Sequence, residues 1–253
     1  MTIDPTVPRP RIVVTLAVAA EQPRPELAAR RNELYLAAVA RHGADAVPLD
    51  ARTSREARDD ALERMDGLLF SGGADIHPSR YGQAVVGAES IEDARDALEA
   101  MAWQRAGARG VPVLGICRGL QAINVFSGGT ILQHVEGHAG PGWGTGPAAT
   151  HPLRVVAGTR LWDVLGTPDS LLVNAYHHQG IREGDLAPGL RAAAWADSPA
   201  GPLVEGLEAT DGRFVMGVQC HPERTESTPV EFERLFAAFV AAAAASAGRS
   251  TRE

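Results

Sequence analysis

The sequence has few of the features that mark exported, membrane-spanning or nucleic-acid-binding proteins. It contains two cysteines in 253 residues, which is too few for a disulfide framework and favours a reducing, cytoplasmic location. No stretch approaches the roughly 20 apolar residues of a membrane span, and the first residues, MTIDPTVPRPR, show no basic segment followed by an apolar one. The net charge of −7 comes with scattered arginines, which argues against nucleic acid as a partner.

The sequence also shows no GxxxxGK[ST] phosphate loop and no cluster with metal-ligand spacing. We therefore expect no cofactor, no metal and no nucleotide-binding domain. The length suits a single α/β domain over residues 1–253, with a core at about 11–240 and flexible ends at 1–10 and 246–253. The Ala-rich stretch Ala237–Ala247 looks like a helix end that frays into the polar tail.

Short apolar runs alternate with amphipathic stretches along the first half of the chain. This alternation predicts a doubly wound, mostly parallel sheet flanked by helices, as in flavodoxin-like folds. Shorter runs in the second half predict an additional small antiparallel portion. Predicted strands lie at 12–18, 47–49, 67–70, 111–114, 153–156, 171–173, 190–195, 204–208 and 214–219, and predicted helices at 25–41, 54–64, 89–106 and from 229 onward.

The most informative stretch is GICRGLQ, Gly115 to Gln121, which follows the apolar run VPVL. It places Cys117 between two glycines, which is the sequence form of a nucleophile elbow, where a strand reverses sharply into a helix. We expect an exposed thiol at the helix start, with a pKa lowered by the helix dipole. A buried structural cysteine is the alternative interpretation of this residue alone.

A base for this thiol is offered by GVQCHPE, Gly217 to Glu223. If His221 and Glu223 lie in extended chain, their side chains share one face. Glu223 would then orient the imidazole ring, which completes the nucleophile, base and orienter of a catalytic triad. Cys220 should point to the opposite face and serve packing. An α/β-hydrolase is disfavoured, because its acid precedes the histidine in the chain.

Together these motifs resemble the class I glutamine amidotransferase-like superfamily. Within it, Arg118 and three further segments resemble the peptidase C26 group: SGGADIHPSRYG from Ser71, RDALE from Arg95 and VNAYHHQ from Val173. The resemblance runs from about Ile12 to about Phe239. It implies a cysteine-dependent hydrolase that cleaves a γ-glutamyl amine, such as γ-glutamyl-γ-aminobutyrate, through a γ-glutamyl thioester.

The resemblance also implies roles for residues around the triad. The backbone N–H groups of Gly73 and Arg118 would form the oxyanion hole, with Gly72 beside them. Gln121 would hold the α-amino and α-carboxylate ends of the substrate, and the segment after Val173 would add backbone contacts. The substrate-contact candidates are Gly72, Arg80, Tyr81, Gln121, Asn174, Tyr176, His177, His178 and Gln179. Asp96 and Glu99, one helical turn apart, suit a structural cap or a salt bridge better than catalysis.

Several departures from the group's pattern concern substrate choice. Cys220 replaces a usual Trp, Ala175 replaces a usual Ser, and the glycine-rich stretch 138–149 is expected to form a mobile loop near the site, with Trp143 placed to cover a substrate. Two rival functions stay open: a glutaminase component that supplies ammonia to a partner synthetase, and a non-catalytic protein that binds a γ-glutamyl metabolite. The sequence also leaves open which amine is released, to which metabolic pathway the reaction belongs, whether the γ-glutamyl group is hydrolysed or transferred to another amine, and whether the chain forms a homodimer.

Overall fold

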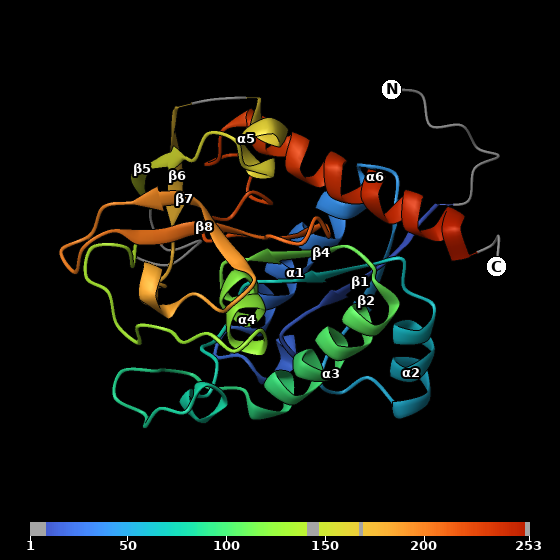
Figure 1. Cartoon of the computed structure of the whole chain (residues 1–253). Helices are drawn as coiled ribbons and strands as arrows, with labels where there is room; N and C mark the ends of the chain where they lie inside the picture. Colours follow the sequence, from blue (N-terminus) through green and yellow to red (C-terminus); the bar gives the residue numbers. More distant parts are fainter. Residues whose placement is uncertain (1–8, 141–146, 167–168, 251–253) are drawn as a thin grey trace.

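The computed structural model describes residues 9–140, 147–166 and 169–250 (Figure 1), with no side-chain description for 249 and 250. Trp143 lies outside the described residues, as do most of the predicted flexible ends, 1–8 and 251–253. In the described part of the chain, no helix is both long and apolar enough to cross a membrane.

Nine strands in the described residues form one sheet in the order β2-β1-β3-β4-β9-β8-β7-β5-β6. The first five in this order pair in parallel, and the remaining pairs are antiparallel. This arrangement confirms the predicted fold class. The bounds are β1 Arg11–Thr15, β2 Asp45–Leu49, β3 Gly67–Phe70, β4 Val113–Ile116, β5 Ala149–Val155, β6 Ser170–Ala175, β7 Leu190–Ala196, β8 Leu203–Ala209 and β9 Val215–Val218.

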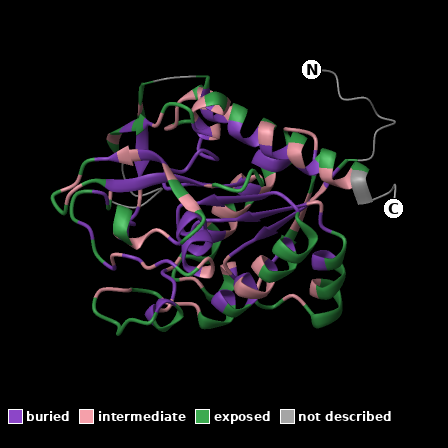
Figure 2. Cartoon of the chain, in the orientation of Figure 1, coloured by how far each residue is buried: buried purple, intermediate pink, exposed green. Residues whose placement is uncertain are grey.

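Helices cover both faces of the sheet, because successive strand residues point to opposite sides. In β3, Leu69 packs into one buried cluster, with α1, α5 and α6, while Leu68 and Phe70 pack into the other, with α2, α3 and α4. Figure 2 shows the buried stripes of the helices turned toward the sheet. The α-helices are α1 Pro25–Ala40, α2 Arg55–Glu63, α3 Asp93–Arg109, α4 Arg118–Phe126, α5 Arg160–Leu165 and α6 Glu233–Ser250.

The carboxyl ends of the parallel strands meet at one edge, where ligands bind in open α/β sheets. The segment Ser71–Gly73 follows β3, Cys117 follows β4, and the HPE segment follows β9. The register fixes this convergence, because Ile116 at the end of β4 pairs with Val218 at the end of β9. The parallel half of the sheet therefore brings the sequence motifs to a common place.

The structure corrects three local predictions. Strand β9 ends at Val218, so His221 and Glu223 lie in the turn that follows rather than in extended chain. Cys220 is likewise off the strand, although it is buried among apolar side chains as expected. Helix α6 does not fray at Ala237–Ala247 but continues to Ser250. Ala-rich sequence has high helix propensity, and Phe239 and Ala243 anchor this helix on the sheet.

Candidate active site

The turn at Cys117 has the backbone of a nucleophile elbow. Its φ of 54° lies in the left-handed region, which a side chain other than glycine rarely adopts. The flanking glycines are required by space. A Cβ atom on Gly115 would lie 2.4 Å from the Gly119 carbonyl oxygen, and one on Gly119 would lie 2.1 Å from the Phe70 carbonyl oxygen. The GxCxG spacing therefore lets β3, β4 and α4 close around the cysteine.

The Cys117 thiol is buried, contrary to the prediction of an exposed thiol with a lowered pKa. Burial raises the pKa of Cys117 to about 12, because it penalises the thiolate more than the nearby Arg224 guanidinium favours it. A hydrogen bond from the Arg118 backbone N–H opposes this rise. The amide nitrogen of Gln219 also donates to the sulfur, at 3.4 Å. In the free protein at neutral pH the cysteine is therefore a neutral thiol that needs a base.

His221 and Glu223 form a close pair, as the sequence predicts, although a turn rather than a strand brings them together. The ring Nδ1 lies 2.8 Å from Glu223 Oε1. Burial would raise the pKa of Glu223, but His221 and Arg224 outweigh burial and keep this pKa below its usual value. Burial and Arg224 lower the pKa of His221 despite Glu223. A neutral His221 that donates from Nδ1 to this carboxylate keeps a lone pair on Nε2, as a general base requires.

Tyr35, on α1, contacts both the glycine loop and His221. Its hydroxyl accepts a hydrogen bond from the Gly72 backbone N–H at 3.0 Å and lies 3.3 Å from His221 Nδ1. A Cβ atom on Gly72 would lie 2.9 Å from His221 Cε1 and 3.5 Å from Cys117 Cβ. Gly72 is therefore the place where the loop, the cysteine and the histidine meet, and a larger residue would separate them.

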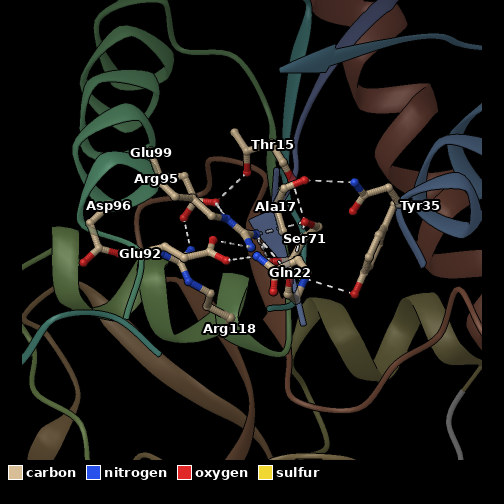
Figure 3. A network of polar contacts seen from close by, with 12 residues as sticks. Thr15, Ala17, Gln22, Tyr35, Ser71, Glu92, Arg95, Asp96, Glu99 and Arg118 are labelled. Atoms are coloured by element: carbon tan, nitrogen blue, oxygen red, sulfur yellow. Dashed lines mark hydrogen bonds and ion pairs between the residues drawn. The ribbon is translucent and has the colours of Figure 1, made fainter. Parts of the chain in front are cut away.

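A buried ion network holds the glycine loop from the other side (Figure 3). Arg95 donates to the carbonyl oxygens of Ser71 and Gly72, at 3.1 and 3.0 Å, and to Glu99 at 2.9 Å. The Arg118 side chain pairs with Asp96 at 2.5 Å and also with Glu99. Asp96 and Glu99 thus have the predicted salt-bridge role. Because the Arg118 guanidinium is engaged, the backbone N–H is the part of Arg118 that faces the sulfur.

A cavity of about 510 Å³ opens beside these groups. Cys117, His221, Gly72 and Gly73 line it, which places the predicted nucleophile, base and oxyanion loop at one hollow. Cationic and anionic side chains both reach its wall: Arg31, Arg224, Asp75 and Glu89. The cavity can therefore hold a small molecule that carries charges of both signs.

The predicted substrate contacts divide into two sets. Tyr176 and His178 line the cavity together with Gly72. The Tyr176 ring meets the His221 ring edge to face at 5.6 Å. His178 pairs with Asp75 at 2.9 Å, and this hydrogen bond raises its pKa.

The other predicted contacts do not line the cavity. Arg80 is exposed, and Tyr81 is packed in the apolar cluster with α3 and α4. Gln121 donates to Gln219 and to the Gln179 carbonyl oxygen. Neighbours in the chain point in different directions, and the substrate contacts of these residues stay predictions.

Asn174, Gln179 and His177 also lie away from the cavity wall. The Asn174 side chain accepts from the His221 backbone N–H at 2.8 Å and donates to the His221 carbonyl oxygen at 3.1 Å, so it positions the histidine rather than a substrate. Gln179 is buried and donates to the Gln133 carbonyl oxygen. His177 lies with His138, His151 and Glu205 in a separate buried cluster.

Sequence reasoning missed Tyr35, Arg31, Asp75, Gln219 and Arg224. Tyr35 and Arg31 lie on helix α1, whose sequence is that of an ordinary amphipathic helix, so no sequence motif indicates a role for them at the site. Gln219 and Arg224 flank the HPE segment, and this proximity was the available signal. Arg224 also packs over the Tyr176 ring, with its guanidinium carbon 4.2 Å from the ring centroid.

Comparisons with known proteins show the family of this chain. The peptidase C26 family model matches residues 13–223. Rv2859c of Mycobacterium tuberculosis, provisionally named a glutamine amidotransferase, is 38% identical over 195 residues, which is 76% of this chain and 60% of that protein's length. The γ-glutamyl-γ-aminobutyrate hydrolase PuuD of Escherichia coli is 31% identical over 224 residues, covering 83% of this chain and 85% of that protein.

The fold has counterparts among solved structures. The glutaminase domain of Trypanosoma brucei CTPS, solved with bound acivicin, superposes with a TM-score of 0.63 at 18% identity and covers 93% of this chain and 94% of that one. At this identity the likeness concerns the fold alone. The family model covers most of the chain, including the elbow and the HPE segment, and this protein belongs to the peptidase C26 family.

Proposed function

We propose that the protein is a cysteine-dependent hydrolase that cleaves the γ-glutamyl amide bond of a γ-glutamyl amine to give glutamate and the free amine. The observation that carries this proposal is the meeting of Cys117 on a strained elbow with the His221–Glu223 pair at one cavity. The names of relatives such as PuuD, a γ-glutamyl-γ-aminobutyrate hydrolase, support the same chemistry.

The chemistry starts from a neutral thiol and a neutral imidazole. His221 Nε2 takes the thiol proton as the Cys117 sulfur attacks the γ-carbonyl carbon, so that no free thiolate has to persist in the buried site. The Gly73 and Arg118 backbone N–H groups hold the oxyanion. His221 then gives its proton to the departing amine, which leaves a γ-glutamyl thioester. A water molecule, deprotonated by His221, attacks the thioester, and glutamate and the thiol are released.

The charges at the cavity support a glutamyl group as the acyl part. A γ-glutamyl substrate carries an α-carboxylate and an α-ammonium group. Arg31 and Arg224 can pair with the first, and Asp75 and Glu89 with the second, since all four reach the cavity wall. The amine side would then contact Tyr176 and the His178–Asp75 pair. The exposed position of Arg80 gives it no part in this arrangement.

The test is glutamate release by the purified chain from γ-glutamyl-γ-aminobutyrate, γ-glutamyl monoamines and glutamine, side by side. The Cys117→Ala variant should lose at least about 10⁴-fold in kcat, as removal of a nucleophile does in other acyl-transfer enzymes. Cys220→Ala is the matched control, because this second buried cysteine lies off the cavity. It should keep activity within a few-fold.

Preference for a γ-glutamyl amine over glutamine, lost in Cys117→Ala and kept in Cys220→Ala, would support the hydrolase. Preference for glutamine that rises when a synthetase is added would contradict it and favour the glutaminase component. Tight binding of these compounds with no release of glutamate would favour a binding protein.

A further inference from the structure

A second cluster of chemically active side chains lies in the antiparallel half of the sheet, outside the catalytic cavity. His138 precedes β5, His151 lies on β5, His177 follows β6, and Glu205 lies on β8. One donor atom from each falls within 4.8 Å of all the others. Glu205 is 0% exposed, and His138 and His177 are 3% and 4% exposed. Four segments far apart in the sequence thus bring imidazole and carboxylate groups to one buried point.

The inward atoms of this cluster lack hydrogen-bond partners among the described residues: His138 Nδ1, His151 Nε2, His177 Nε2 and both carboxylate oxygens of Glu205. Buried polar atoms are nearly always paired, because an unpaired one costs about 1–3 kcal/mol and a buried charge costs more. Five such atoms face one another here, and a single group that accepts electron pairs would satisfy several of them.

The outward ring nitrogens define the tautomers. His177 Nδ1 lies 2.9 Å from the Gln179 carbonyl oxygen, His151 Nδ1 lies 3.2 Å from the Pro152 carbonyl oxygen, and His138 Nε2 lies 3.3 Å from the Asp197 carbonyl oxygen. Because a carbonyl only accepts, each of these nitrogens carries the hydrogen. The inward nitrogen of each neutral ring then has its lone pair aimed into the cluster. Metal-bound histidines in proteins almost always show this outer hydrogen bond.

Distances within the cluster fit a four-coordinate ion better than direct pairing. Glu205 Oε2 lies 3.6 Å from His151 Nε2, and Glu205 Oε1 lies 3.6 Å from His177 Nε2. These separations are too long for good hydrogen bonds. Ligand atoms about 2.0–2.2 Å from a zinc ion lie about 3.3–3.6 Å apart in a tetrahedron. Each oxygen of Glu205 therefore lies at the spacing of two tetrahedral zinc ligands from one histidine nitrogen, and one of the two oxygens would bind the ion.

We propose that His138, His151, His177 and Glu205 bind one divalent transition-metal ion, and that this ion is Zn²⁺. Three imidazoles and one carboxylate suit zinc, which prefers four-coordinate tetrahedral sites. The protein fills all four positions, so the ion has a structural role and leaves no place for a reacting water. A dication would also compensate the Glu205 charge, which has no cationic side chain hydrogen-bonded to it among the described residues.

The ion would fix one wall of the catalytic cavity. His177 lies between Tyr176 and His178, and both of these residues line the cavity. Binding of His177 to a metal would hold the backbone of this segment against β5 and β8. The proposal does not depend on the substrate or on the hydrolase activity, because it concerns a separate group of residues.

The experiment measures metal content in protein purified without a polyhistidine tag and without added metal. We expect about one zinc per chain in the wild type. Glu205→Gln and His177→Gln should lower zinc affinity by at least about 100-fold, since losing an outer hydrogen bond alone costs about 10–100-fold. His134→Ala is the matched control, because this exposed histidine lies on the same loop as His138 but outside the cluster. Cys117→Ala should also keep its zinc, which excludes binding at the catalytic cysteine.

A second measurement uses only the wild type, so it tests the proposal even if the variants fail to fold. The wild type is stripped with a chelator and titrated with Zn²⁺ and with Co²⁺. Stoichiometric binding, a rise in melting temperature and the intense visible absorption of four-coordinate Co²⁺ would support the site. The proposal is overturned if the stripped wild type binds neither ion at one equivalent, if Co²⁺ shows only the weak spectrum of six-coordination, or if Cys117→Ala removes the metal while Glu205→Gln keeps it.

Discussion

Two buried polar clusters in this protein solve the problem of buried charge in opposite ways. In the parallel half, Arg95 and Arg118 face Asp96 and Glu99, and each carboxylate has a guanidinium partner. In the antiparallel half, Glu205 faces three histidines whose other nitrogens are already directed to carbonyl oxygens. In the first cluster every carboxylate is ion-paired, although Arg95 Nη1 and Arg118 Nε have no hydrogen-bond partner among the described residues. In the second, neither oxygen of Glu205 has a hydrogen-bond partner among them. The pairing of the carboxylates thus distinguishes a structural ion network from the cluster that we propose as a metal site.

The largest expected effect comes from breaking the complete cluster. Arg118→Met leaves Asp96 and Glu99 with one arginine between them, and removing one partner of a buried ion pair costs about 3–5 kcal/mol. We expect a loss of unfolding free energy of at least this size in urea denaturation. Arg80→Met, at an exposed arginine, is the control and should stay within about 0.5 kcal/mol. Equal losses of unfolding free energy in the two variants would show that Arg118 does not stabilise the Asp96 and Glu99 carboxylates as described.

A matched pair of substitutions tests the contrast itself. Glu99→Gln should destabilise the protein by about 3–5 kcal/mol with or without zinc, because two arginines lose their partner. Glu205→Gln should not lower stability in the presence of a chelator, since the carboxylate has no cationic partner to lose. With Zn²⁺ at about 100 times its dissociation constant, the wild type should gain about 2.7 kcal/mol and Glu205→Gln should not. A similar loss of stability in Glu205→Gln with chelator and with Zn²⁺ would contradict the difference between the two clusters.

The pH dependence of stability gives a further test of the ion pairs of Glu99. Burial alone would raise the pKa of Glu99, but Arg118 and Arg95 outweigh it and hold this pKa below its usual value. A group with a lowered folded-state pKa adds stability that is present above its unfolded pKa of about 4.3 and is lost as pH falls through the folded pKa. The stability difference between wild type and Glu99→Gln should therefore shrink in urea titrations carried from pH 7 to pH 3. A difference that is constant over this range would refute the assignment.

The two clusters also differ in how far the sequence predicts them. The strand pattern and the glycine spacing predict that Cys117, Ser71–Gly73 and His221 meet at one edge of the sheet, because parallel strands have their carboxyl ends at the same edge. For Asp96 and Glu99 the sequence predicts a structural cap or salt-bridge role, and the structure pairs both carboxylates with Arg118. No sequence motif marks the cluster of three histidines and Glu205. Its members come from distant parts of the chain, and the antiparallel strand register and the loops between strands bring them together.

Burial explains the remaining errors at the site. The sequence predicts an exposed thiol with a lowered pKa, whereas the folded chain encloses Cys117 and raises its pKa to about 12. Side-chain direction explains why Gln121, Asn174 and His177 do not line the cavity, because a motif gives the order of residues but not the face that each one presents. The catalytic roles of Cys117, His221 and Glu223 stay predictions until activity is measured.

The smallest expected effect concerns the contact between the glycine loop and His221. Tyr35→Phe removes the acceptor of the Gly72 N–H and the hydroxyl beside His221 Nδ1. Loss of one hydrogen bond is worth about 0.5–1.5 kcal/mol, so kcat should fall about 2- to 10-fold. Tyr81→Phe is the control, because its buried hydroxyl has no hydrogen-bond partner among the described residues and lies off the cavity. Steady-state rates on a γ-glutamyl amine measure both. A tyrosine hydroxyl that only fills space would give the same small change at both positions, whereas one that aligns the loop with the histidine lowers kcat at Tyr35 alone.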